Sequence, residues 1–181
     1  MEQLGFDAED ASEATEKLSK GIQGLPTSLS EITANTQSLA LLTGNLNEAT
    51  KLSIALNDAF LASGASSADA ERGLTQYTQM LSAGKVDMQS WKTLLETMGV
   101  ALNDVAAEFG YTGSSAKNDL YNALKDGDIT FDEFNQCLIN LDKGLSTAND
   151  SFVSFADRAL TSSEGIATSL QNIRTAVVTG L

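Results

Sequence analysis

Apolar residues recur every three or four positions along most of the chain, which is the spacing of one face of an α-helix. In the stretch Gln76–Met98, two such stripes flank Gly84: Leu74, Tyr77, Met80 and Leu81 before it, and Trp91, Leu94, Leu95 and Met98 after it. Glycine takes the left-handed conformation of a helix C-terminus at little cost. The pattern therefore predicts a helix ending at Ala83, a turn at Gly84 and a second helix opening at Asp87.

The residues around Asp87 predict how the second helix begins. Asp87 can act as an N-cap by accepting hydrogen bonds from the first free backbone N–H groups. Val86 and Trp91 have the spacing of a hydrophobic staple. We therefore expect the turn, and the angle at which the two helices meet, to be fixed by local contacts.

The same helix–glycine–helix unit occurs again 43 residues later. Its matching positions are Leu120, Leu124, Gly127, Ile129, Thr130, Phe134, Leu138 and Leu141. Thr130 and Glu133 have the spacing of a capping box, and Ile129 and Phe134 that of its staple. Repeat proteins usually need at least three copies. Two copies indicate an internal pseudo-repeat within one domain.

The N-terminal segment, residues 1–43, has a heptad-like seam, interrupted at Pro26, made of Leu4, Ala8, Ala11, Thr15, Leu18, Ile22, Leu25, Leu29, Ile32, Thr36 and Leu39. Two interpretations remain open. The segment is either a coiled-coil arm that reaches a partner chain, or two amphipathic helices folded onto the domain as an antiparallel pair.

The expected domain covers residues 44–145, beginning at Gly44–Asn45 and closing at Gly144. One helix carries an apolar stripe from Leu46 to Phe60 and stops at Gly64. Ser66 or Ser67 caps the next helix. Gly99 is expected to separate the Trp91 helix from a short helix that carries Leu102, Val105, Ala106 and Phe109.

A second helical arm is expected over residues 146–181. Its apolar positions are Phe152, Phe155, Ala159, Leu160, Ile166, Leu170, Ile173, Val177 and Leu181. The pattern continues to the last residue, which suggests the start of a longer coiled-coil region in a larger protein. Exposed seams on both arms would favour self-association.

Composition supports an all-α fold, because the chain has a single proline and is rich in Ala, Leu, Ser, Glu and Asp. The net charge of −13 argues against nucleic-acid binding, which needs a basic surface. No apolar run is long enough for a membrane span. The one cysteine, Cys137, excludes an internal disulfide and is predicted to be a packed free thiol.

The sequence offers little catalytic chemistry. It contains no histidine, so Ser-His and Cys-His arrangements and His-ligated metal sites are absent. Paired carboxylates remain formally possible among Glu96, Asp104, Glu108, Asp126, Asp128, Asp132 and Glu133. Surface and capping roles account for these acids better. No catalytic residue, metal ligand or cofactor site is predicted.

Two further motifs bear on binding. The segment Asp126–Glu133 resembles part of a calcium-binding loop, but it is short by about two residues for an EF-hand. Trp91 and Phe134 are expected in the core as staple residues. Phe131 and Tyr111 are weak candidates for an exposed partner-binding surface.

The region from residue 42 to 145 resembles the conserved domain near the N-terminus of phage tail tape measure proteins. The first glycine turn of that pattern is met by Gln76, Gln79, Met80, Gly84 and Lys85, and the second by Leu124, Gly127, Ile129 and Thr130. The segments between and before them match at Leu42, Thr43, Gly44, Ala65, Trp91, Leu94, Glu96, Ala106 and Gly110. One departure is Met98–Gly99, near which many members carry a proline.

The resemblance implies a structural role, in which the protein sets tail length as a scaffold during tail assembly. It also implies tail tube and tail assembly proteins as partners. The implied location is the host cytoplasm during assembly and the tail lumen afterwards. Two alternatives were kept: a cell-wall-degrading module of a tail protein, and a helical protein-interaction adaptor.

Overall fold

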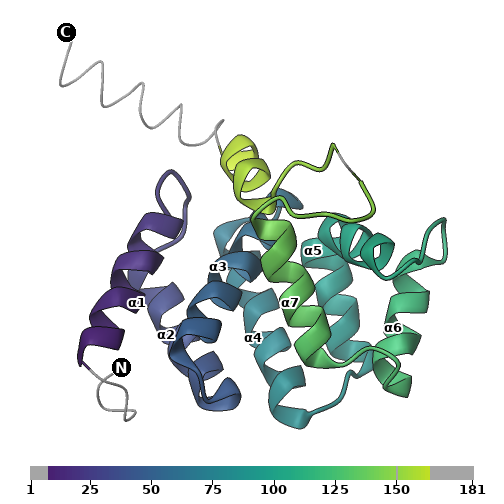
Figure 1. Cartoon of the computed structure of the whole chain (residues 1–181), viewed down its shortest axis with the longest axis horizontal. Coiled ribbons are helices and arrows are strands. Elements are labelled where there is room, and N and C mark those ends of the chain that lie inside the picture. The colour runs from purple at the N-terminus through teal and green to yellow at the C-terminus, as the bar shows by residue number, and fades with distance from the viewer. Residues whose placement is uncertain (1–7, 150, 164–181) are drawn as a thin grey trace, which may run out of the picture.

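The computed structural model describes residues 8–149 and 151–163. Helices account for most of these residues, and no strand occurs among them (Figure 1). The all-α fold class is therefore confirmed. The helices are α1 (Ala8–Gly21), α2 (Leu29–Thr43), α3 (Leu46–Ala62), α4 (Ser67–Ala83), α5 (Met88–Glu108), α6 (Ala116–Asp126), α7 (Phe131–Asp142) and an unlabelled helix over residues 155–163.

Helix α3 is the element around which the others pack. It contacts α1, α2, α4, α5 and α7, and residues on every side of it are buried. Three of its alanines, Ala49, Ala55 and Ala59, are fully buried among its large apolar residues. A helix buried on most of its sides forms the centre of a core, and its small side chains let neighbouring helices approach closely.

The N-terminal segment packs onto this core, so the second of its two interpretations describes the structure. α1 contacts α2 and α3, and α2 contacts α3 and α4. The seam residues Leu18, Ile32 and Leu39 are buried. They are therefore not free to pair with a second chain. Gly44–Asn45 is a turn between two packed helices, not a boundary between an arm and a domain.

The beginning of the C-terminal segment also belongs to the core. Phe155 and Ala159, in the helix over residues 155–163, are fully buried in the same hydrophobic cluster. Arg158 lies over the rings of Phe152 and Phe155 and binds Asp104 of α5 at 2.8 Å. The packed core therefore continues beyond residue 145 and includes the helix over residues 155–163. The arm predicted from Ile166 to Leu181 lies outside the described residues.

The expected separation near Gly99 is present as a kink at Met98, across which two helical stretches join to form α5. α5 runs from Met88 to Glu108 with non-helical angles at Met98 (φ −140°, ψ 35°). Met98 is fully buried. The kink turns both halves of α5 toward the core. Trp91 and Leu94 before it, and Leu102 and Val105 after it, are all buried.

Gly73 marks the tightest contact between helices. It lies in α4, where a Cβ atom would be 2.5 Å from Cε1 of Phe60 and 2.8 Å from Oγ1 of Thr97. Phe60 belongs to α3 and is fully buried, and Thr97 belongs to α5. The ring cannot move aside without disturbing the core. Gly73 therefore permits α3, α4 and α5 to meet at one point.

We expect Gly73→Ala to destabilise the protein. Overpacking a core costs about 1–3 kcal/mol, and the higher helix propensity of alanine returns at most about 1 kcal/mol. The net loss, up to about 2 kcal/mol, is measurable by urea denaturation. The matched control is Gly99→Ala in α5, where the nearest atom is Lys117 Nζ at 3.5 Å. If Gly99→Ala lowers the free energy of unfolding as much as Gly73→Ala does, the packing argument is contradicted.

Candidate functional site

Both helix–glycine–helix turns lie at the same end of the helical bundle, toward the bottom of Figure 1. Gly84 ends α4 with φ 73°, and Gly127 ends α6 with φ 82°. Both angles are in the left-handed region that glycine adopts without strain. The α2–α3 turn at Gly44–Asn45 lies at this end too, beside the end of α4 and the start of α7. We call this face the turn end.

In the first unit, Asp87 caps α5. Its carboxylate accepts hydrogen bonds from the Ser90 backbone N–H at 2.8 Å and from the Ser90 hydroxyl at 2.9 Å. These bonds, the backbone one foremost, hold the pKa of Asp87 below its ordinary value because they favour the charged form. Val86 and Trp91, the predicted staple, are both buried.

In the second unit, Thr130 and Glu133 form a reciprocal capping box. The Thr130 hydroxyl accepts a hydrogen bond from the Glu133 backbone N–H, and the Glu133 carboxylate accepts one from the Thr130 backbone N–H, both at 3.1 Å. Ile129 and Phe134 beside them are buried. The start of α7 is therefore fixed by contacts within four residues of sequence.

Aromatic side chains of one unit pack against aromatic side chains of the other. The ring of Tyr77 in α4 lies 5.8 Å from that of Phe134 in α7, and Trp91 in α5 lies 5.7 Å from Tyr121 in α6. The first helix of each unit thus contacts the second helix of the other. The Tyr77 hydroxyl donates a hydrogen bond to Asn135 Oδ1. The pseudo-repeat is therefore assembled into one core.

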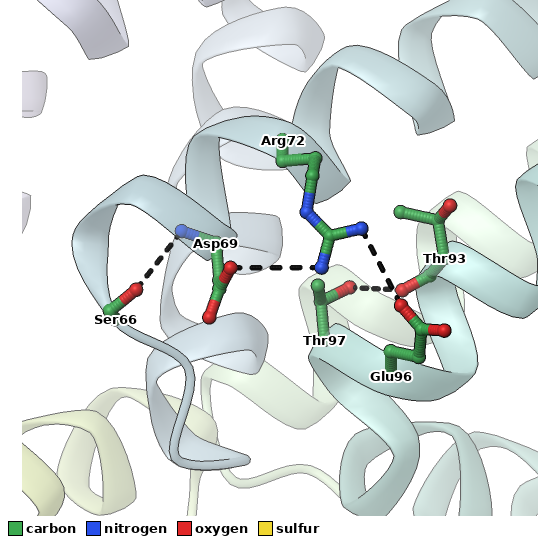
Figure 2. A network of polar contacts seen from close by, with 6 residues as sticks. All are labelled: Ser66, Asp69, Arg72, Thr93, Glu96 and Thr97. Carbon is green, nitrogen blue, oxygen red and sulfur yellow. Dashed lines mark hydrogen bonds and ion pairs between the residues drawn. The ribbon is translucent and has the colours of Figure 1, made fainter.

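A polar network on the surface joins α4 to α5 (Figure 2). Arg72 lies between Asp69 at 3.6 Å and Glu96 at 3.5 Å. Ser66 caps α4 by accepting a hydrogen bond from the Asp69 backbone N–H. The ion pairs are about half exposed, and such pairs stabilise a protein little. The network accounts for Glu96 without any catalytic role.

Structural contacts also account for three other candidate acids. Asp104 binds Arg158, and Glu133 belongs to the capping box. Glu108 accepts hydrogen bonds from Ser146 Oγ and from the backbone N–H groups of Thr147 and Ala148. The remaining candidates, Asp126, Asp128 and Asp132, are exposed. Nowhere in residues 8–149 and 151–163 are three or more potential ligand side chains grouped to hold a metal ion.

A buried pair of carboxyl groups, Asp58 and Asp142, was missed by the sequence analysis. Asp58 lies in α3 with 2% of its surface exposed, and its carboxyl group hydrogen-bonds to that of Asp142 at the end of α7. Two carboxyl groups can form such a bond only when one is protonated. Burial raises the pKa of both, and the bond to Asp142 raises the pKa of Asp58 further. Both shifts favour a proton shared between the two carboxyl groups, with Asp58 the more readily protonated of the two.

Cys137 and the two aromatic candidates are partly buried. Burial, with a smaller effect from the charge of Glu108, raises the pKa of Cys137 to about 12, so the side chain is a thiol at neutral pH. Phe131 and Tyr111 pack against the core. Part of each ring stays exposed, so their role as candidates for a partner-binding surface stays a prediction.

Phe131 lines a groove of about 650 Å³ at the turn end, which we call the turn-end groove. Its walls come from the α2–α3 turn, the end of α4 and the start of α7, and include Leu42, Glu48, Leu81, Phe131, Asp132 and Asn135. A second groove, of about 550 Å³, is lined by Cys137, Leu145 and Glu108 among others. Each groove borders α7.

The described residues thus form a helical domain whose buried and capping side chains serve its own packing. This arrangement defines the protein as an all-α structural domain. All 181 residues match the family model for tape measure proteins, and the chain belongs to that family. Neither the curated proteins nor the solved structures contain a match.

Membership in this family makes the chain a component of a phage tail and places it in a structural family not known for catalysis. The recognition of a tape measure domain from the two glycine turns is confirmed. Within the described residues, no helix combines the length and the apolar composition needed to cross a membrane.

Replacing the capping threonine should weaken the fold modestly. We expect Thr130→Ala to lower the free energy of unfolding by about 1 kcal/mol, because the first turn of α7 loses its cap. Thermal or urea denaturation measures the loss. Ser115→Ala is the matched control, since Ser115 precedes α6 without a capping hydrogen bond. Equal losses in the two variants would show that the capping box does not stabilise the domain.

The carboxyl pair should make stability depend on pH. The pKa of Asp58 is raised on folding, so its contribution is fully present below the unfolded value, near 3.8, and is lost as pH rises through the folded pKa. Asp58→Asn keeps a hydrogen bond to Asp142 without ionising. We therefore expect this variant to gain stability over the unmodified protein as pH rises from 4 toward 8.

The measurement is the urea midpoint of each protein at several pH values. Each variant is compared with the unmodified protein at the same pH. This comparison cancels the contribution of carboxylates such as Asp87, whose lowered pKa makes stability rise with pH. Asp128→Asn, at an exposed position, serves as the control and should track the unmodified protein. A constant difference between Asp58→Asn and the unmodified protein across this range would refute the shared proton.

Proposed function

We propose that this chain is a scaffolding part of a tape measure protein that sets tail length during assembly. It acts in the host cytoplasm while the tail is built and then lies in the tail lumen. Tail tube and tail assembly proteins are its partners. The family match over residues 1–181 supports this role.

The compact fold supports a more specific role for the described domain. An α-helix rises 1.5 Å per residue, so residues 8–163 as one straight helix would extend over about 230 Å. Instead, α1, α2, α4, α5 and α7 all fold back against α3. Such a domain adds little length per residue. We infer that it anchors or docks the tape, and that an extended region elsewhere in the protein measures.

The test is an in-frame deletion of residues 46–142 in the phage, with tails examined by electron microscopy. If the domain docks the tape, the deletion should abort tail assembly. If it measured as a rod, tails should still form and be shorter by about 145 Å. Shorter tails would contradict the docking role, and tails of unchanged number and length would contradict any tape role for this segment.

A point variant that leaves the fold intact serves as the control for the deletion. Arg72→Ala removes two exposed ion pairs and should leave the fold intact. Phages carrying it should assemble normal tails. An assembly defect as severe as that of the deletion would mean that tail assembly depends on this exposed network. It would contradict a docking role that belongs to the domain as a whole.

A further inference from the structure

The turn-end groove places apolar side chains among polar ones, with Leu42 exposed at its edge. Leu52 is buried beneath it, and Leu81 and Phe131 are half-buried in its walls. Leu42 at the rim is 41% exposed, and its neighbour Leu41 is 63% exposed. Large apolar side chains grouped on the surface of a domain often mark a protein-binding site.

The groove also carries two carboxylates without internal partners. Glu48 and Asp132 line it, and neither carboxylate makes a hydrogen bond or ion pair with any residue of the described chain. The groove has no lysine or arginine in its walls. Burial raises the pKa of Tyr77, and the charge of Asp132 raises it further. The electrostatic potential of the groove is therefore negative.

The second groove beside α7 offers a useful contrast. Its two carboxylates, Glu108 and Glu133, are held by hydrogen bonds to the 146–148 loop and within the capping box. They are not free to bind a partner. Unsatisfied carboxylates next to apolar side chains distinguish the turn-end groove from this otherwise similar feature.

Asn135 adds a polar group to the turn-end groove. It lines the groove with only 8% of its surface exposed, and its side-chain oxygen accepts the hydrogen bond from Tyr77. The amide N–H groups of Asn135 are thus the part of the side chain left to donate to a bound segment. A backbone carbonyl of a docked peptide is a suitable acceptor.

The geometry points to a short cationic segment of another protein as the occupant of the turn-end groove. A large apolar side chain of that segment packs on Leu42, Leu81 and Phe131, and a flanking Lys or Arg pairs with Glu48 and Asp132. This inference rests on the docking role proposed above. A second copy of this chain is disfavoured because each copy carries a net charge of −13. Anionic membranes and nucleic acids are repelled for the same reason.

The first experiment is an NMR titration of the ¹⁵N-labelled 181-residue chain with a synthetic amphipathic peptide of leucine and lysine. A peptide of leucine and glutamate with the same apolar pattern is the control probe. We expect amide shifts to cluster around Leu42, Phe131 and Asn135 with the lysine peptide alone. Shifts scattered over the surface, or equal binding of both peptides, would overturn the inference.

Paired charge variants provide a quantitative test. The double variant Glu48→Gln/Asp132→Asn should weaken binding of the lysine peptide about five- to tenfold, as expected for two exposed ion pairs. The control, Glu31→Gln/Asp157→Asn, removes two exposed acids outside the groove. It should weaken binding less than about twofold, the residual effect of net charge. Equal weakening by the two variants would mean attraction by net charge alone.

The same double variant in the phage separates this inference from the proposed function. If deletion of residues 46–142 blocks assembly and the double variant also reduces tail yield, both stand. If the deletion blocks assembly and the double variant assembles like its control, the docking role stands and the groove is not its surface. If the deletion leaves tails unchanged, the proposed function itself fails.

Discussion

The burial of α3 is the constraint on which the rest of the domain depends. Five helices contact it, and the helix alternates leucine and phenylalanine with fully buried alanines. The small residues bring neighbouring backbones close, and Gly73 of α4 extends this close packing to Phe60 and Thr97. Because burial of apolar surface drives folding, a helix buried over most of its surface organises the elements that cover it.

The two helix–glycine–helix units are built locally and joined through aromatic side chains. Caps within three residues of each turn fix where α5 and α7 begin. The contacts Tyr77–Phe134 and Trp91–Tyr121 then cross from one unit to the other. A duplicated element can in this way form one core. It also leaves both glycine turns at one end of the domain, the end at which the turn-end groove lies.

Several acidic side chains of the domain stabilise its own fold. Glu96, Asp104, Glu108 and Glu133 each bind a partner within the chain. Two other groups of acids differ from these: the buried carboxyl pair of Asp58 and Asp142, and the unpaired carboxylates of the turn-end groove. The first links stability to pH, and the second supplies a surface with the charge and shape to hold a basic partner.

The sequence by itself determined the features that depend on neighbouring residues: the helices, the glycine turns, the N-cap at Asp87 and the capping box at Thr130. Their hydrogen bonds span three or four positions, so spacing reveals them. Only the tertiary structure decided where amphipathic faces go. The heptad-like seam of α1 and α2 suits a partner chain or α3 equally. Asp58, Phe131 and Gly73 take their roles from helices distant in sequence, which periodicity cannot identify.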